Sequence, residues 1–156
     1  MFKIIVELFF LVIIQAAITP FIRRLAFVLG AVDNPNARRV NKKPMPTLGG
    51  LGIFVTYNIG AFVLLREQFP THELFSVLLA SSVVVLTGMI DDILELKPRQ
   101  KMIGIFVAAL IIYFLAGIRM NVLNLPFIHN EVHLGWWSLP ITIFWILALT
   151  NAVNLI

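Results

Sequence analysis

The chain of 156 residues contains no cysteine, and only 13% of its residues are charged. The absence of cysteine excludes disulfide bonds and metal sites built from thiolate ligands. The scarcity of charge is more informative, because a soluble domain carries about 25% charged residues. Hydrophobic residues make up 60% of the chain, and its mean hydropathy is +0.95. Since the charges are too few to cover a globule in water, we expect an integral membrane protein.

Apolar residues are gathered in five segments, which are residues 4–22, 48–65, 74–90, 103–118 and 138–156. Each segment is close to the ~20 residues that a helix needs to cross a hydrocarbon core of ~30 Å. Backbone polar groups in lipid must be paired within each segment, which favours helices over open strands. The predicted fold is therefore all-α: one polytopic membrane domain over residues 1–156, with about five transmembrane helices.

The 12 Lys and Arg residues are distributed unevenly between the connections. Nine of them lie in the first and third connections, and these are Arg23, Arg24, Arg38, Arg39, Lys42, Lys43, Lys97, Arg99 and Lys101. The positive-inside rule makes the side that holds these two connections cytoplasmic. We therefore expect the N-terminus outside and the C-terminal end in the cytoplasm. The net charge of +4 fits membrane topology, and we expect no nucleic-acid partner.

Two adjacent carboxylates, Asp91 and Asp92, follow the third apolar segment in the stretch GMIDDILELKPRQK. At the C-terminal end of a helix they meet the negative pole of the helix dipole, and they repel each other. The basic residues of the same connection, or a hard divalent cation such as Mg²⁺, would compensate their charge. The alternative is that the pair merely ends the helix at the membrane interface, and the pair alone favours neither explanation.

The first connection contains the stretch DNPNARRVNKKPMPTLGG, which leads into the second apolar segment. Its two later prolines stiffen the approach, and Gly49 and Gly50 allow a helix or a ligand to come close. The start of the following helix offers unpaired amides beside Lys42, Lys43 and Thr47, which together would suit a phosphate. A topogenic basic loop is the alternative, but it explains only the charges.

Asn151 and Asn154 lie three residues apart near the end of the chain, on one face of the predicted last helix. Amide side chains in an apolar helix either join helices or bind a ligand, and taken alone this pair favours the first role. In the outer connection, Trp136 and Trp137 indicate an interfacial anchor. The histidines of that connection, His129 and His133, lack a third ligand and are expected to belong to a plain loop.

Taken together, the first-connection stretch, GMIDDILELKPRQK and TNAVNLI resemble the polyprenyl-phosphate N-acetylhexosamine-1-phosphate transferases, and they stand in the family order. Members of this family start peptidoglycan, teichoic-acid and O-antigen synthesis. The resemblance implies transfer of N-acetylhexosamine-1-phosphate, with GlcNAc the favoured sugar, from a UDP-sugar to undecaprenyl phosphate, with release of UMP. It implies a Mg²⁺ cofactor, with Mn²⁺ as a substitute, and a site at the cytoplasmic face of a bacterial membrane. UDP-N-acetylhexosamine, undecaprenyl phosphate and membrane lipid are the implied partners, and a homodimer is compatible with the sequence.

The resemblance also implies roles for single residues. Asp91 and Asp92 would be the catalytic pair near the lipid phosphate and the metal, with Asp91 the better candidate for deprotonating the acceptor. The implied substrate-binding residues are Lys42, Lys43, Thr47, Lys101, Asn151 and Asn154. Asn41 stands where many relatives of the teichoic-acid type have histidine, so no role carries over to it.

The chain ends at Ile156, whereas the family motif continues as N-x-x-N-L-x-D-G-x-D-G-L-A. We therefore expect the N-terminal half of such a transferase, inactive by itself, with the main metal ligand beyond Ile156. A non-enzymatic five-helix membrane scaffold or partner protein is the alternative. An ion-coupled transporter is disfavoured, because such proteins place ionisable groups near the bilayer midplane rather than at helix ends.

Overall fold

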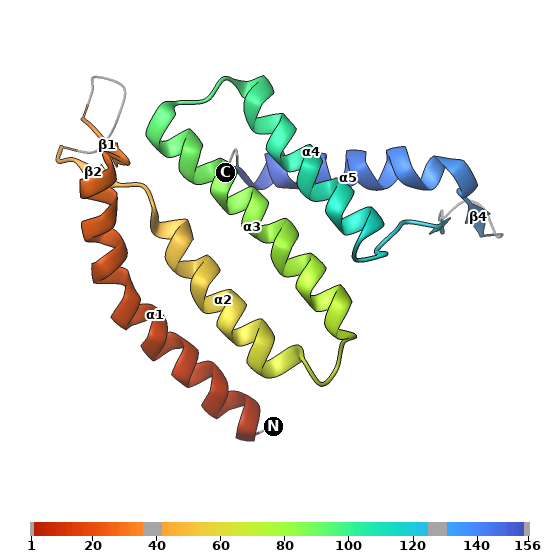
Figure 1. Cartoon of the computed structure of the whole chain (residues 1–156), viewed down its shortest axis with the longest axis horizontal. Helices are drawn as coiled ribbons and strands as arrows, with labels where there is room; N and C mark the ends of the chain where they lie inside the picture. The colour runs from red at the N-terminus through yellow and green to blue at the C-terminus, as the bar shows by residue number, and fades with distance from the viewer. Residues whose placement is uncertain (1, 36–41, 125–130, 155–156) are drawn as a thin grey trace.

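The computed structural model describes residues 2–35, 42–124 and 131–154, which are mainly helical (Figure 1). The helices in these ranges are α1 (Phe2–Leu29), α2 (Gly49–Leu65), α3 (Thr71–Leu94), α4 (Pro98–Phe114), the short 3₁₀ helix η1 (Gly135–Trp137) and α5 (Ser138–Asn154). Two antiparallel hairpins pair β1 (Val32–Asp33) with β2 (Met45–Pro46) and β3 (Val122–Leu123) with β4 (Val132–His133). Each predicted apolar segment overlaps one α-helix, so the all-α prediction is confirmed.

Helix α1 continues about two turns beyond its predicted end at residue 22, and it contains Pro20 in its interior. A helix in lipid tolerates such a proline when neighbouring groups pair the freed backbone. The helix ends instead at Gly30, which has a φ of +74°. There the N–H of Ala31 bonds to the carbonyl of Ala26 at 3.0 Å, which is the pattern of a helix terminated by a left-handed glycine.

The third and fourth helices also differ from the predicted boundaries. Helix α3 extends to Leu94, so Asp91 and Asp92 lie in its last turn and not after it. Helix α4 begins at Pro98, five residues before the predicted start at residue 103, because proline is well suited to the first helical position. The link between α3 and α4 is consequently only residues 95–97.

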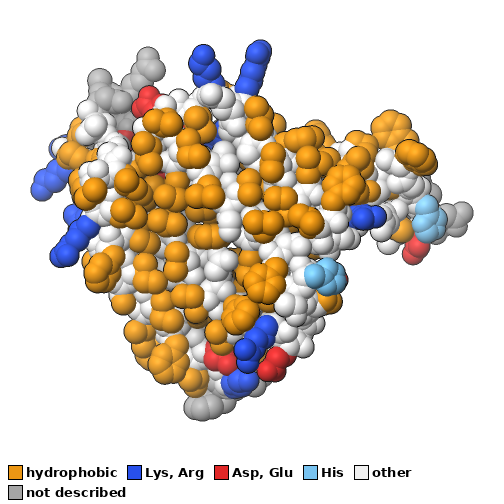
Figure 2. All heavy atoms as spheres, in the orientation of Figure 1, with side chains coloured by type: hydrophobic (Ala, Val, Ile, Leu, Met, Phe, Trp, Pro, Cys, Tyr) orange, Lys and Arg blue, Asp and Glu red, His pale blue; other side chains and the backbone are white. Residues whose placement is uncertain are grey.

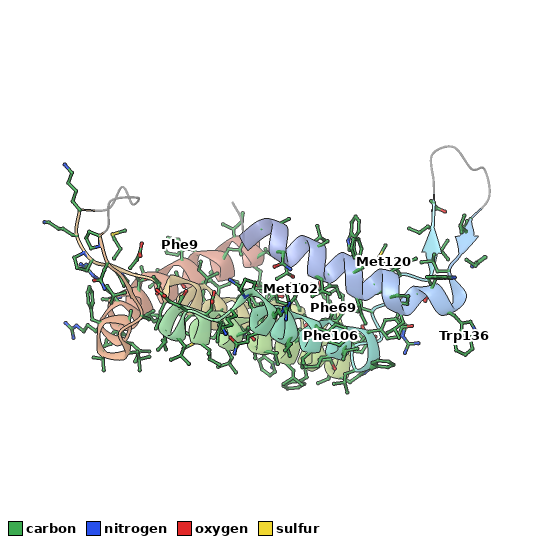
Figure 3. The ribbon with its side chains drawn as sticks, turned by 90° about the horizontal axis from the view of Figure 1, so that it is seen from above. Phe9, Phe69, Met102, Phe106, Met120 and Trp136 are labelled. Atoms are coloured by element: carbon green, nitrogen blue, oxygen red, sulfur yellow. The ribbon has the colours of Figure 1, made fainter. Side chains whose placement is uncertain are left out.

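Helices α1 to α4 lie next to one another in chain order and form a single layer (Figure 1). Helix α5 crosses one side of this layer obliquely and packs on α4 (Figure 3). The β3–β4 hairpin and η1 project beyond the layer, and Trp136 points away from the rest of the protein. The side chain of Trp136 is 98% exposed, which suits the predicted interfacial anchor.

Small residues bring α2 close to α1. A Cβ added at Gly60 would overlap Leu11, and one added at Gly52 would lie 3.0 Å from the amide of Gln15. In the same interface the hydroxyl of Thr56 donates to Oε1 of Gln15 at 2.6 Å. Glycine contacts and interhelical hydrogen bonds are the usual means by which helices associate in lipid. At Gly49 and Gly50, where we expected a helix or a ligand to come close, no other helix makes such a contact; the space beside both residues is open, and Gly50 lines a cavity.

The surface of the layer is largely apolar. Figure 2 shows hydrophobic side chains over most of one face, between two edges where charged side chains gather. Three helices are long and apolar enough to cross a membrane, within Lys3–Leu29, Thr71–Leu94 and Gly135–Val153, and the shorter helix Gly49–Leu65 is also apolar. The chain is therefore a multi-pass membrane protein, whereas its count of five spans and its orientation stay predictions.

Three segments that are distant in the sequence meet at one edge of the layer. The β1–β2 hairpin, the α3–α4 link and the C-terminal end of α5 all lie there, while the α2–α3 connection lies at the opposite edge (Figure 1). These three segments carry the motifs that the sequence singled out. This shared edge therefore holds the candidate site.

Candidate functional site

The link between α3 and α4 is organised around the carboxylate of Asp91. Its Oδ1 accepts a hydrogen bond from the backbone N–H of Leu96 at 3.1 Å. Its Oδ2 lies 2.8 Å from Nζ of Lys101 and forms an ion pair with it. The cation that was expected to offset the aspartate pair is therefore Lys101, whereas Lys97 and Arg99 are exposed.

Local sequence explains why the chain turns so sharply at this point. Glu95 adopts a left-handed conformation with φ +48°, and its N–H closes α3 by bonding to the carbonyl of Asp91 at 2.8 Å. Pro98 then opens α4, and the N–H of Lys97 donates to Oε1 of Gln100 at 2.9 Å. A left-handed residue other than glycine costs about 1–2 kcal/mol. The bonds that Asp91 makes across the turn help to offset that cost.

Asp92 has a different environment from its neighbour. Its carboxylate is exposed and makes no ion pair within the described ranges. Two residues from other elements interact with it: Thr47, which directly follows β2, and Lys101 of α4, whose positive charge also acts on it. Thr47 is held in place by Ala31, because its N–H and its hydroxyl both donate to the carbonyl of Ala31, at 3.0 and 2.9 Å. The β1–β2 hairpin thus positions a hydroxyl beside the aspartate pair.

Two cavities meet at Thr47, Asp91 and Asp92. The first has a volume of about 400 Å³ and lies between α2, α3, α4 and the end of α5, with mainly apolar walls. Lys101 and Thr150 are among its polar residues. The second, of about 640 Å³, lies between β1 and the α3–α4 link and is more polar. A ligand with an apolar part and a charged part could place the charged part at this junction.

The structure brings only some of the predicted site residues together. Asp91, Asp92, Thr47 and Lys101 line the same cavity. Lys42 and Lys43 are exposed and line neither of the two cavities. Their predicted place in the site is therefore not supported by this geometry.

Of the two asparagines in the last helix, the structure describes the side-chain contacts of Asn151. Asn151 donates to the carbonyl of Leu147 at 2.8 Å and to the sulfur of Met102 at 3.2 Å, so it joins α5 to α4. This agrees with the helix-joining role that the sequence favoured. Asn154 ends α5, but its side chain lies outside the described residues, as do Asn41 and His129.

Thr87 and Thr150 line the first cavity, and the sequence analysis did not select them. Thr87 lies four residues before Asp91, so it shares that face of α3, and its hydroxyl donates to the carbonyl of Val83 at 2.7 Å. A hydroxyl one helical turn before a candidate carboxylate could have identified Thr87 from the sequence. Thr150 carried no comparable signal, because its contact with the cavity depends on how α5 crosses the layer.

The donor set partly fits a magnesium ion. Within the described ranges no group of three or more His, Cys, Asp or Glu side chains could hold a metal. Mg²⁺, however, is commonly bound through one or two carboxylates together with substrate phosphates and water. Asp92 is available for such a contact, and Asp91 lies beside it with both oxygens already engaged.

Comparison with known proteins places the chain in a family. The pattern of glycosyl transferase family 4 matches residues 74–156. The chain is 33% identical, over all of its length, to a probable undecaprenyl-phosphate N-acetylglucosaminyl 1-phosphate transferase of Bacillus subtilis, of which it covers 43%. It is 29% identical, over 99% of its length, to a phospho-N-acetylmuramoyl-pentapeptide-transferase of Bacillus velezensis, of which it covers 51%.

A third relative is the undecaprenyl-phosphate alpha-N-acetylglucosaminyl 1-phosphate transferase of Yersinia pestis, which is 28% identical over 96% of this chain and 40% of its own length. No solved structure matches the chain significantly. The chain spans about half the length of the curated relatives that it matches. Because the family pattern covers more than half of its residues, the chain belongs to glycosyl transferase family 4.

Proposed function

We propose that these residues form part of a transferase that moves N-acetylglucosamine-1-phosphate from UDP-N-acetylglucosamine to undecaprenyl phosphate and releases UMP. The observation that carries the proposal is the junction of the two cavities, where Asp91, Asp92, Thr47 and Lys101 meet. The names of the Bacillus subtilis and Yersinia pestis relatives support the sugar and the lipid. The site would face the cytoplasm of a bacterial cell and serve the start of surface polymer synthesis, such as teichoic acid or O-antigen.

The reaction exchanges one phosphorus–oxygen bond for another. An oxygen of the lipid phosphate bonds to the β-phosphorus of the UDP-sugar, and the bond from that phosphorus to the oxygen bridging the α-phosphate breaks. UMP leaves with the bonding electrons, and the sugar keeps its phosphate. Such a transfer requires positioning and charge neutralisation more than covalent help from the protein.

The two cavities suit the two substrates. The apolar cavity of about 400 Å³ would accept the first part of the lipid chain, with its phosphate at Lys101. The more polar cavity of about 640 Å³ would accept the nucleotide diphosphate. Bound Mg²⁺ or Mn²⁺ would neutralise charge on the diphosphate, and Asp92 with Asp91 beside it are the residues of this chain that would hold it.

The 156 residues alone are proposed to be inactive. Relatives are about twice as long, and the single layer of α1 to α4 leaves wide apolar faces that further helices could cover (Figure 3). Reading the gene beyond the codon for Ile156 tests this directly. An in-frame continuation of the D-G-x-D-G kind supports the proposal. Sugar-phosphate transfer by the purified 156-residue chain would contradict it.

The reaction itself is tested on the full-length product of the gene. Purified in detergent, it is supplied with UDP-N-acetylglucosamine and Mg²⁺, with or without undecaprenyl phosphate, and UMP is measured. We expect release of UMP only when the lipid is present, loss of release in Asp92→Asn, and no change in Arg99→Gln, which removes an exposed charge in the first turn of α4. If no UMP appears with the lipid present, the scaffold alternative becomes the better explanation.

A further inference from the structure

The two neighbouring aspartates differ in what they contact. Successive residues of a helix point about 100° apart, so adjacent side chains do not face the same partner. Asp91 points across the α3–α4 link, where its two oxygens bind Leu96 and Lys101. Asp92 lines the more polar cavity, as Asp91 does, but its neighbour across the site is Thr47. The pair therefore cannot act as two equivalent carboxylates.

We propose that Asp91 is a positioning residue and that Asp92 is the carboxylate of the pair that contacts the reacting phosphates. The proposal rests on the proposed function, and it reverses the expectation that Asp91 deprotonates the acceptor. The backbone hydrogen bond on one oxygen of Asp91 and the ammonium on the other fix the orientation of its carboxylate and use about half of its acceptor sites. Asp91 instead fixes the start of α4 and the direction of Lys101.

Asp92 has more free acceptor capacity than Asp91. Within the described ranges it forms no ion pair, and its neighbour Thr47 also donates to the carbonyl of Ala31 at 2.9 Å. A threonine hydroxyl has a single hydrogen to donate, so Thr47 occupies at most one of the acceptor sites of Asp92. An exposed carboxylate of this kind, at the wall that two cavities share, is suited to a proton or to a cation that accompanies phosphate.

Lys101 links the positioning role to the reaction. Its ammonium is held by Asp91 at 2.8 Å and also lines the apolar cavity. A lysine has four flexible bonds along its stem, so an ion pair restricts where the charge lies. Without Asp91, Lys101 would still be present but would no longer be held at the phosphate. The effect of changing Asp91 should therefore depend strongly on Lys101, whereas the effect of changing Asp92, which feels the charge of Lys101 without pairing with it, should depend on it much less.

A first experiment measures backbone hydrogen exchange in the 156-residue chain in detergent micelles. Asp91→Ala and Asp92→Ala are matched, because both remove one carboxylate from the same helical turn. We expect the Leu96 amide to exchange about tenfold faster in Asp91→Ala, since it loses its acceptor, and to be unchanged in Asp92→Ala. Equal exchange of this amide in the two variants would overturn the positioning role.

A second experiment measures UMP release by the full-length gene product in a double-mutant cycle. Asp91→Asn should lower turnover about 10–100-fold, as loss of a supporting partner typically does, and should cost little more once Lys101→Met is present. Asp92→Asn should lower turnover about 10²–10⁴-fold, and this factor should change much less than that of Asp91→Asn when Lys101→Met is present. Arg99→Gln, an exposed cation in the same turn as Lys101, is the control that should not change turnover.

The two experiments separate failure of this inference from failure of the proposed function. If the unaltered protein releases no UMP, the proposed function fails, while the exchange of the Leu96 amide still decides whether Asp91 positions the turn. If the unaltered protein is active, an Asp91→Asn loss that is as large as that of Asp92→Asn and independent of Lys101 would overturn the division of roles.

Discussion

An alanine at position 104 is predicted to weaken the packing of α4 on α3. A Cβ built on Gly104 overlaps the side chain of Thr87, and the nearest atom is the hydroxyl oxygen. Thr87 has little freedom to move away, because it is β-branched and its hydroxyl is bonded to the carbonyl of Val83 at 2.7 Å. Overpacking of this kind costs about 1–3 kcal/mol, against about 1 kcal/mol gained when alanine replaces glycine inside a helix.

Gly88→Ala is the matched control for this prediction. Gly88 is also inside a helix, yet a Cβ added there meets nothing within 4 Å. Both variants gain helix propensity, so Gly104→Ala should have a free energy of unfolding about 1–3 kcal/mol below that of Gly88→Ala. Titration of the protein with SDS in mixed micelles, followed by circular dichroism, measures the difference. Equal free energies, or a more stable Gly104→Ala, would refute the reasoning.

Three further predictions use the same titration. Gln15→Leu breaks the hydrogen bond with Thr56 between α1 and α2 and should lower the free energy of unfolding by about 0.6 kcal/mol. Adding Thr56→Val should cause no further loss, and additive losses would contradict a direct bond. Thr142→Val leaves the backbone N–H of Met120 without its acceptor and should lower the free energy of unfolding by about 1–3 kcal/mol. Thr142→Ser keeps a hydroxyl and should lower it clearly less; equal losses in the two variants would count against this contact. Gly30→Ala forces a side chain into a left-handed conformation at the end of α1 and should cost about 1–2 kcal/mol, and an unchanged stability would show that the helix end can relax.

The sequence was sufficient to predict the helices but not where they end. Hydropathy marks the stretch that suits lipid, whereas a helix continues until its backbone meets a terminating residue. Gly30 ends α1 and Pro98 begins α4, and both were readable signals of the usual kind. The end of α3 was less accessible, because Glu95 takes a left-handed conformation that its side chain does not favour.

The contacts of the candidate site were likewise only partly predictable from the sequence. The approach of Lys101 to Asp91 could be expected, since both belong to one short connection and have opposite charges. The place of Thr47 beside Asp92 depends on the β1–β2 hairpin and on the bonds of Thr47 to Ala31, which are contacts between residues 16 apart. Which of the two carboxylates remains free depends on helix phase and side-chain contacts, and spacing alone could not indicate it.

The most direct test of the account follows the β-phosphate of the sugar nucleotide. The full-length gene product is given UDP-N-acetylglucosamine labelled with ³²P at the β-position, together with undecaprenyl phosphate and Mg²⁺. The account predicts that the label moves to the lipid fraction as unlabelled UMP is released in equal amount, and that Asp92→Asn slows both about 10²–10⁴-fold. Label that stays in the aqueous phase as UDP, or no turnover at all, would contradict the claim that donor and acceptor phosphates meet at the end of α3.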